Sequence, residues 1–126
     1  MSVAPAAKAP LILVVEDEWL IADMIEHALG DAGYRTLGPA ATAEQALGLI
    51  ARQPCDAALL DLNLGGDKSF AVIDRLVALR TPHLLVTGYC VTDLPERYRD
   101  TTLIPKPLAP EVMITALNAL LRPRVA

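Results

Sequence analysis

Cysteine, histidine and long apolar runs are scarce in this chain, and each scarcity excludes a class of protein. The two cysteines, Cys55 and Cys90, have neither the spacing of a zinc site nor the density of a disulfide scaffold. We interpret them as reduced, small hydrophobic residues of a cytoplasmic protein. The two histidines, His27 and His83, lie far apart with no second ligand at metal-binding spacing, so we interpret both as structural.

The sequence also lacks a membrane span, a secretion signal and a basic stripe. The apolar run that begins at Leu11 ends at Glu16, which is far too short to cross a bilayer, and the Ala/Pro-rich start has no cleavage-site pattern. The net charge of −4 argues against nucleic acid or an anionic membrane as the main partner. We expect a flexible tail over residues 1–9 and a single folded domain over residues 10–124.

Short apolar segments alternate with amphipathic segments along the rest of the chain. Strands are predicted over residues 11–15, 34–38, 55–62, 83–88 and 102–107. Helices are predicted over residues 21–32, 42–53, 69–79, 92–100 and 109–121, with a loop over 63–68. Five strands alternating with five helices predict an α/β fold in which a parallel sheet is covered by helices on both faces.

Particular residues set the ends and the inner faces of these elements. Thr42 is the expected N-cap of the second helix, and Gly33 is expected to end the first. Pro105 suits only an edge strand, because proline cannot donate to the ladder. We expect the first helix to bury Ile21, Met24, Ile25, Ala28, Leu29 and Ala32, and the third to bury Phe70, Ile73, Leu76 and Val77.

Charged and hydroxyl side chains collect where four of the strands end. Glu16 and Asp17 follow the first strand, Asp61 closes the third, Thr87 closes the fourth and Lys106 lies at the end of the fifth. In parallel sheets these carboxyl ends meet at one edge, where ligands bind. Like charges about 4 Å apart cost about 4 kcal/mol at an effective dielectric near 20, so we expect a cation. Three carboxylates, one Mg²⁺ and one lysine sum to zero charge, and Mg²⁺ prefers such oxygen ligands.

Four motifs occur in order at these strand ends: "VVED", "LLDLNL", "VTGY" and "IPKP". With them the chain resembles the receiver domain of two-component response regulators, a family of signal-transduction phosphoproteins, from Leu11 to about Arg122. The resemblance implies a flavodoxin-like (βα)5 doubly wound parallel sheet with the strand order 2-1-3-4-5. It also makes the folded domain of residues 10–124 a receiver domain.

The same resemblance implies a role for each residue at the strand ends. Asp61 would be the phosphoacceptor, which takes a phosphoryl group from a phosphohistidine of a histidine kinase or a histidine phosphotransfer protein. Thr87 would hydrogen-bond the phosphoryl oxygens and Lys106 would pair with them, in keeping with a reaction that depends mostly on alignment and charge. The protein would be no enzyme beyond catalysing its own phosphorylation and slow dephosphorylation.

Mg²⁺ is the cofactor that the resemblance implies. Its ligands would be the carboxylates of Glu16, Asp17 and Asp61 and the backbone carbonyl of Asn63. A cis peptide bond between Lys106 and Pro107 is implied as well.

The chain departs from the family pattern at one position of its fifth strand. Leu103 stands where many receivers carry an aromatic switch residue, so Tyr89, two residues after Thr87, is the candidate replacement. "LVTGY" partly resembles a subgroup of largely single-domain regulators whose fourth strand reads Phe-Ala-Thr-Gly followed by an aromatic residue. We expect no output domain after the last helix, and therefore signalling through an unknown downstream protein or a phosphorelay.

Trp19 is expected near the mouth of the site. A step of 100° per residue places it opposite the apolar stripe of the first helix. It either folds over a neighbouring loop as a lid or, with Leu20 beside it, anchors a helical partner that carries the histidine. We favour the anchor, with Tyr89 as a further candidate contact.

The alternative function is a Mg²⁺-dependent aspartyl phosphatase of the haloacid dehalogenase type, which also uses a strand-end Asp, a lysine and Mg²⁺. The nucleophile of those enzymes typically lies on the first strand, with a second Asp two residues later. Here Asp61 lies on the third predicted strand and residue 63 is asparagine, so the sequence favours the receiver.

Overall fold

A computed structural model describes residues 9–65, 67–88, 94–98 and 101–122 of the chain. Its elements follow the predicted alternation of strands and helices. In chain order they are β1 (Leu11–Val15), α1 (Trp19–Asp31), β2 (Arg35–Ala40), α2 (Ala43–Arg52), β3 (Ala57–Asp61), β4 (Asn63–Leu64), β5 (Asp67–Lys68), α3 (Phe70–Ala78), β6 (His83–Thr87), the 3₁₀ helix η2 (Glu96–Tyr98), β7 (Thr102–Pro105) and α4 (Pro110–Leu120).

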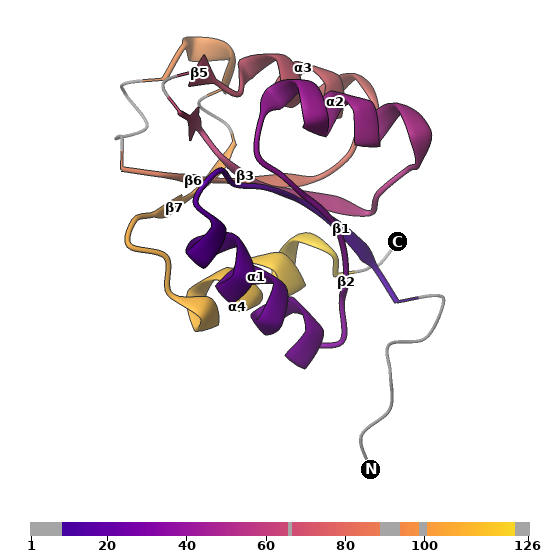
Figure 1. Cartoon of the computed structure of the whole chain (residues 1–126), viewed down its shortest axis with the longest axis vertical. Helices are drawn as coiled ribbons and strands as arrows, with labels where there is room; N and C mark the ends of the chain where they lie inside the picture. Colours follow the sequence, from indigo (N-terminus) through magenta and orange to yellow (C-terminus); the bar gives the residue numbers. More distant parts are fainter. Residues whose placement is uncertain (1–8, 66, 89–93, 99–100, 123–126) are drawn as a thin grey trace.

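The five longer strands form one parallel sheet in the order β2-β1-β3-β6-β7. When only these five strands are counted along the chain, β6 and β7 are the fourth and fifth, and the order is the predicted 2-1-3-4-5. Figure 1 shows α1 and α4 on one face of the sheet and α2 and α3 on the other. The strand β7 lies at the edge, which is where Pro105 was expected. The predicted doubly wound α/β fold is therefore confirmed.

The strand β1 explains why the sheet has two cores. All five of its residues are buried, and their side chains point alternately to the two faces of the sheet. Leu13 and Val15 pack with residues of α2 and α3. Ile12 and Val14 pack with residues of α1 and α4. A strand covered on both faces has no polar side, which accounts for the continuous apolar run in the sequence.

The predicted helix signals are present at the ends of the elements. The hydroxyl of Thr42 accepts a hydrogen bond from the Gln45 backbone N–H at 3.1 Å, which caps α2. Gly33 has a φ of +90° just after α1, a conformation that glycine adopts without strain. Pro110 occupies the first turn of α4, where its missing N–H costs no helical hydrogen bond.

Four local predictions need correction. The 63–68 segment, predicted as a loop, contains the antiparallel ladder of β4 and β5. Val77 is 59% exposed because it lies about 90° around α3 from the centre of the buried stripe, and Val72 is buried instead. Ala32 is exposed, since α1 ends one residue earlier. Of the helix predicted over 92–100, the described residues contain only η2.

None of the helices in the described part of the chain combines the length and the apolar character needed to span a bilayer.

Candidate functional site

The carboxyl ends of β1, β3, β6 and β7 bring the predicted site residues to one edge of the sheet. Asp61 and Thr87 are the last residues of β3 and β6, and Lys106 follows β7 directly. The register aligns these ends, because Asp61 pairs with Val86 and Thr87 pairs with Pro105. Parallel strands that are adjacent and in register deliver their last residues to the same place.

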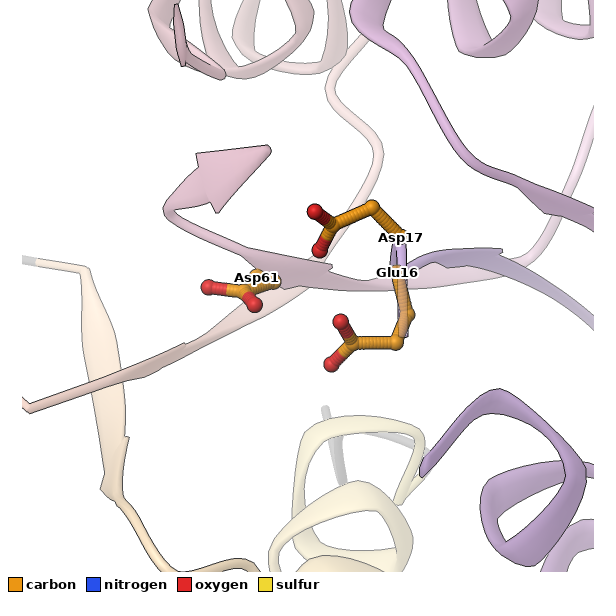
Figure 2. Close-up of side chains that lie close together, drawn as sticks. All are labelled: Glu16, Asp17 and Asp61. Carbon is orange, nitrogen blue, oxygen red and sulfur yellow. The ribbon is translucent and has the colours of Figure 1, made fainter. Parts of the chain in front are cut away.

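Three carboxylates gather at this edge. One carboxylate oxygen from each of Glu16, Asp17 and Asp61 lies within 4.8 Å of the other two. Figure 2 shows the side chains that follow β1 close to the end of β3. Glu16 and Asp61 are only 3% and 4% exposed, whereas Asp17 is exposed. A cluster of oxygen donors, part buried and part open to solvent, suits a divalent cation that keeps some of its water.

The electrostatics of the cluster show the cost of holding these carboxylates without a metal ion. Burial, together with the neighbouring Asp61 and Asp17, raises the pKa of Glu16 from 4.5 to about 7. A backbone N–H from Glu18, 3.1 Å from Glu16 Oε2, acts in the opposite direction. The site therefore favours either a proton on Glu16 or a cation among the three oxygens.

Lys106 supplies the positive charge that the sequence predicted. Its Nζ donates to Asp61 Oδ2 at 2.9 Å, and the Asp61 side chain is far more buried than the lysine. Burial acts to lower the pKa of Lys106, but the hydrogen bond and the charge of Asp61 outweigh it and raise the pKa. The ammonium therefore stays charged over the physiological pH range.

Backbone and hydroxyl donors orient the Asp61 segment. The Asn63 N–H donates to Asp61 Oδ1 at 3.0 Å, so both carboxylate oxygens have a partner. The buried hydroxyl of Ser69 donates to the carbonyl of Asp61 at 3.0 Å. The sequence analysis did not predict this role of Ser69. The residue precedes α3, but its hydroxyl makes no capping hydrogen bond to the helix and donates to the strand-end carbonyl instead.

Gly65 closes the turn beside the carboxylates. It has a φ of +60°, and a Cβ at this position would lie 3.7 Å from Asp17 Oδ2. Glycine therefore provides the backbone conformation of this turn and leaves the space beside Asp17 open.

The structure tests several further predictions. The Lys106–Pro107 peptide is cis, as predicted, and a second cis bond joins Gly38 and Pro39. Leu103 lies on β7 and packs, partly buried, against the core on the α2–α3 face. Tyr89 lies outside the described residues.

Trp19 lies beside the carboxylates and does not pack as a lid. It is 75% exposed, and Leu20 beside it is 65% exposed. Trp19 shares a hollow with Glu16 and Asp17, so an accessible aromatic side chain borders the site. The exposure contradicts the lid interpretation, since a lid would bury most of the ring.

Comparison with known proteins agrees with this geometry. The model of the response regulator receiver domain matches residues 12–118, which is most of the chain. The chain therefore belongs to the response regulator receiver domain family. The family assignment, together with the acidic pocket, decides against the phosphatase alternative and identifies a phosphoacceptor signalling module rather than a conventional enzyme.

Among solved structures, the chain is similar to SdrG from Sphingomonas melonis Fr1, with 38% identity, a TM-score of 0.77 and coverage of 90% of this chain and 97% of that one. It is also similar to a CheY-like receiver domain protein from Methanospirillum hungatei JF-1, with 25% identity, a TM-score of 0.80 and coverage of 90% and 94%. These likenesses place the chain among CheY-like receivers.

The curated relatives are longer proteins. The transcriptional regulatory protein YvrH of Bacillus subtilis is 41% identical over 47% of this chain and 25% of its own length. The transcriptional regulatory protein PdtaR of Mycobacterium tuberculosis is 27% identical over 91% of this chain and 58% of its own length. The match to this chain thus covers about a quarter of the first relative and somewhat over half of the second.

Proposed function

We propose that this receiver accepts a phosphoryl group on Asp61 from a phosphohistidine, with the help of Mg²⁺. The observation that carries the proposal is the position of Asp61, nine-tenths buried, within reach of two other carboxylates and hydrogen-bonded to Lys106. A buried carboxylate with a charged donor on one oxygen and a backbone donor on the other is held in one orientation. Phosphoryl transfer depends on such alignment more than on covalent chemistry by the protein.

The transfer exchanges one bond to phosphorus for another. An Asp61 carboxylate oxygen forms the new P–O bond while the P–N bond to the histidine ring breaks, and the ring nitrogen keeps the bonding electrons. The product is an acyl phosphate on Asp61 and a histidine that takes up a proton from solvent. Lys106 lies where it can offset the charge on the phosphoryl oxygens, and the Thr87 hydroxyl, at the end of the adjacent strand, would donate to them.

Glu16, Asp17, Asp61 and the backbone carbonyl of Asn63 would hold the Mg²⁺ ion. Their oxygens are the donor type that Mg²⁺ prefers, and an acidic cluster of this kind is typical of receivers. When bound, the ion supplies positive charge for the phosphoryl oxygens. Together with Lys106 it balances the three carboxylates.

The partner of the proposed reaction is a histidine kinase or a histidine phosphotransfer protein. Trp19 and Leu20, exposed next to the carboxylates, are the proposed contacts for it, with Tyr89 as a further candidate. We also propose that residues 10–124 form the receiver of a cytoplasmic regulator, which signals through an unknown downstream protein or a phosphorelay.

Mass spectrometry after incubation with acetyl phosphate and Mg²⁺ tests the assignment of Asp61. We expect one added phosphoryl group on the wild-type chain and none on Asp61→Asn. A label retained in that variant, or found on Thr87, would contradict the proposal. Repeated turnover of small phosphate esters would instead point to a phosphatase.

A further inference from the structure

Two stacked aromatic rings connect the helix that follows β3 with the 3₁₀ helix that follows β6. Phe70 is the first residue of α3, which follows Asp61, and Tyr98 is the last residue of η2, which follows β6 and Thr87. Their rings stack with centroids 4.8 Å apart and planes at 9°. Tyr98 is only 2% exposed, so this stack belongs to the core.

The Tyr98 hydroxyl gives the stack a specific hydrogen bond. It donates to Asp74 Oδ1 on α3 at 2.6 Å, a short distance that is typical of a hydroxyl bonded to a carboxylate. Burial and the Asp74 carboxylate raise the pKa of Tyr98, so the hydroxyl keeps its proton. Arg97 lies 3.6 Å from the same carboxylate and 4.4 Å from the Tyr98 ring centroid, but this pair is mostly exposed and contributes less.

The Tyr98 ring belongs to the buried cluster that also contains the residues next to the phosphoacceptor. Leu62 and Leu64, on either side of Asn63, belong to the same buried cluster as Tyr98 and Leu94. The Ser69 hydroxyl, one residue before Phe70, donates to the carbonyls of Asp61 and Leu62. Ser69 and Phe70 therefore connect the Asp61 segment to the Tyr98 ring through the start of α3. In a closely packed core such a connection can carry a shift from one element to the next.

We propose that the contacts of Tyr98 with Asp74 and Phe70, here called the α3–η2 latch, hold η2 against α3 while Asp61 is unphosphorylated, and that phosphorylation of Asp61 releases the Tyr98–Asp74 hydrogen bond. The proposal rests on the proposed function and names how the site is regulated. A phosphoryl group on Asp61 adds oxygens that need donors at the ends of β3 and β6. The two elements joined by the latch start from those ends.

The latch leads to a reciprocal expectation. If phosphorylation opens the Tyr98–Asp74 hydrogen bond, then a chain that lacks this bond binds a phosphoryl mimic more tightly, since it no longer has to break it. A different result is expected if the Tyr98–Asp74 hydrogen bond only stabilises the fold and is kept on phosphorylation. Its loss lowers the unfolding temperature and leaves the affinity for the mimic unchanged.

Beryllofluoride, added with Mg²⁺ as a mimic of the phosphoryl group, is the probe for this test. Tyr98→Phe keeps the ring stack and removes only the hydroxyl, so we expect its dissociation constant for beryllofluoride to fall about three- to tenfold. Asp74→Asn removes the charge of the acceptor and is expected to act in the same direction. The double variant should show little further gain, because both changes remove one interaction.

Tyr34→Phe is the matched control. The Tyr34 hydroxyl also donates to a side chain, Asn118 on α4, but Tyr34 precedes β2 at the end of the sheet remote from the site. This variant should leave the affinity for beryllofluoride at the wild-type value. Unfolding temperatures of all variants show whether each one folds.

The outcomes separate the latch from the proposed function. Unchanged or weaker beryllofluoride binding by both Tyr98→Phe and Asp74→Asn, with a normal wild type, would overturn the latch and leave the phosphoacceptor assignment intact. A wild-type chain that does not bind beryllofluoride would overturn both. An equal gain in Tyr34→Phe would also overturn the latch, because the effect would then be a general loosening of the fold.

Discussion

Lys106 Nζ lies 2.9 Å from Asp61 Oδ2, although 45 positions separate the two residues in the chain. The parallel sheet produces this contact, because β3, β6 and β7 are neighbours and end at the same edge. The lysine is the positive partner of a carboxylate that has almost no contact with water. Its loss would leave Asp61 buried among carboxylates without this charged donor.

The first prediction concerns this pair. Lys106→Met removes the ammonium and keeps much of the apolar stem, so we expect labelling by acetyl phosphate to slow by about 10- to 100-fold. Quantitative mass spectrometry over time measures the rate. Arg122→Met removes one exposed cation elsewhere and should label at the wild-type rate. Equal slowing in both variants would mean that net charge, and not the contact with Asp61, sets the rate.

The second prediction concerns the metal ligands. Asp17→Ala removes a carboxylate and changes the summed charge of the occupied site from zero to +1, so we expect Mg²⁺ binding and phosphorylation to be largely lost. Asp31→Ala removes an exposed carboxylate from the opposite end of α1 and should keep both. Trp19, the only tryptophan of the chain, borders the site and can report Mg²⁺ binding by its fluorescence. Unchanged labelling kinetics in Asp17→Ala would place the metal ion elsewhere.

The third prediction is a pH dependence that arises from Glu16. In the metal-free protein its pKa is about 7, so the folded state holds a proton that the unfolded state loses above pH 4.5. This contribution to stability is complete below pH 4.5 and is lost as the pH rises through about 7. Mg²⁺ needs the deprotonated carboxylate, so its affinity should rise roughly tenfold per pH unit below that value.

Mg²⁺ titrations between pH 5.5 and 8.5, read by Trp19 fluorescence, check this dependence. Glu16→Gln cannot titrate and should bind Mg²⁺ more weakly with a flatter pH profile. The metal-free Glu16→Gln chain should also lose less stability than the wild type between pH 5 and 8. A steep profile that persists in the variant would assign the titration to another group.

Much of the fold could be predicted because local and global signals agree. The apolar run from Leu11 to Val15 is buried on both faces, the Thr42 cap is made, and Pro105 lies on the edge strand. The helical periodicity of apolar residues was less reliable for residues at the edge of a predicted buried face. Val77 is apolar but exposed, since position on the helix and not hydrophobicity decides which side chain meets the sheet.

The site could be predicted only as a set of residue types at strand ends. The sequence places Asp61 and Lys106 at one edge of the sheet, but their hydrogen bond depends on register and on side-chain conformations. Ser69 and the Tyr98–Asp74 contact were not predicted, because both depend on how α3 packs against its neighbours in the folded protein. The periodicity of α3 predicts which of its residues face the core, but it does not predict which polar side chain of another element contacts Asp74.

The fourth prediction concerns Trp19, which starts α1 and is 75% exposed beside the carboxylates. A large aromatic side chain left in water at the mouth of a reactive site is typical of a binding anchor, since tryptophan is enriched among the residues that dominate interfaces. Acetyl phosphate needs no docking, whereas a kinase must place its phosphohistidine against Asp61. Trp19→Ala should therefore slow transfer from the kinase about 10- to 30-fold and change acetyl phosphate labelling by less than about twofold.

The measurement uses a histidine kinase of the same organism that phosphorylates the wild-type chain in a phosphotransfer profile. Leu79→Ala is the matched control, because Leu79 is also exposed but lies at the end of α3 remote from the site. If this control slows transfer as much as Trp19→Ala, exposed apolar area in general matters and Trp19 is no anchor. If both reactions of Trp19→Ala slow together, the ring supports the site itself. If neither reaction slows, the kinase docks elsewhere on the surface, because the rate of transfer does not depend on the Trp19 ring.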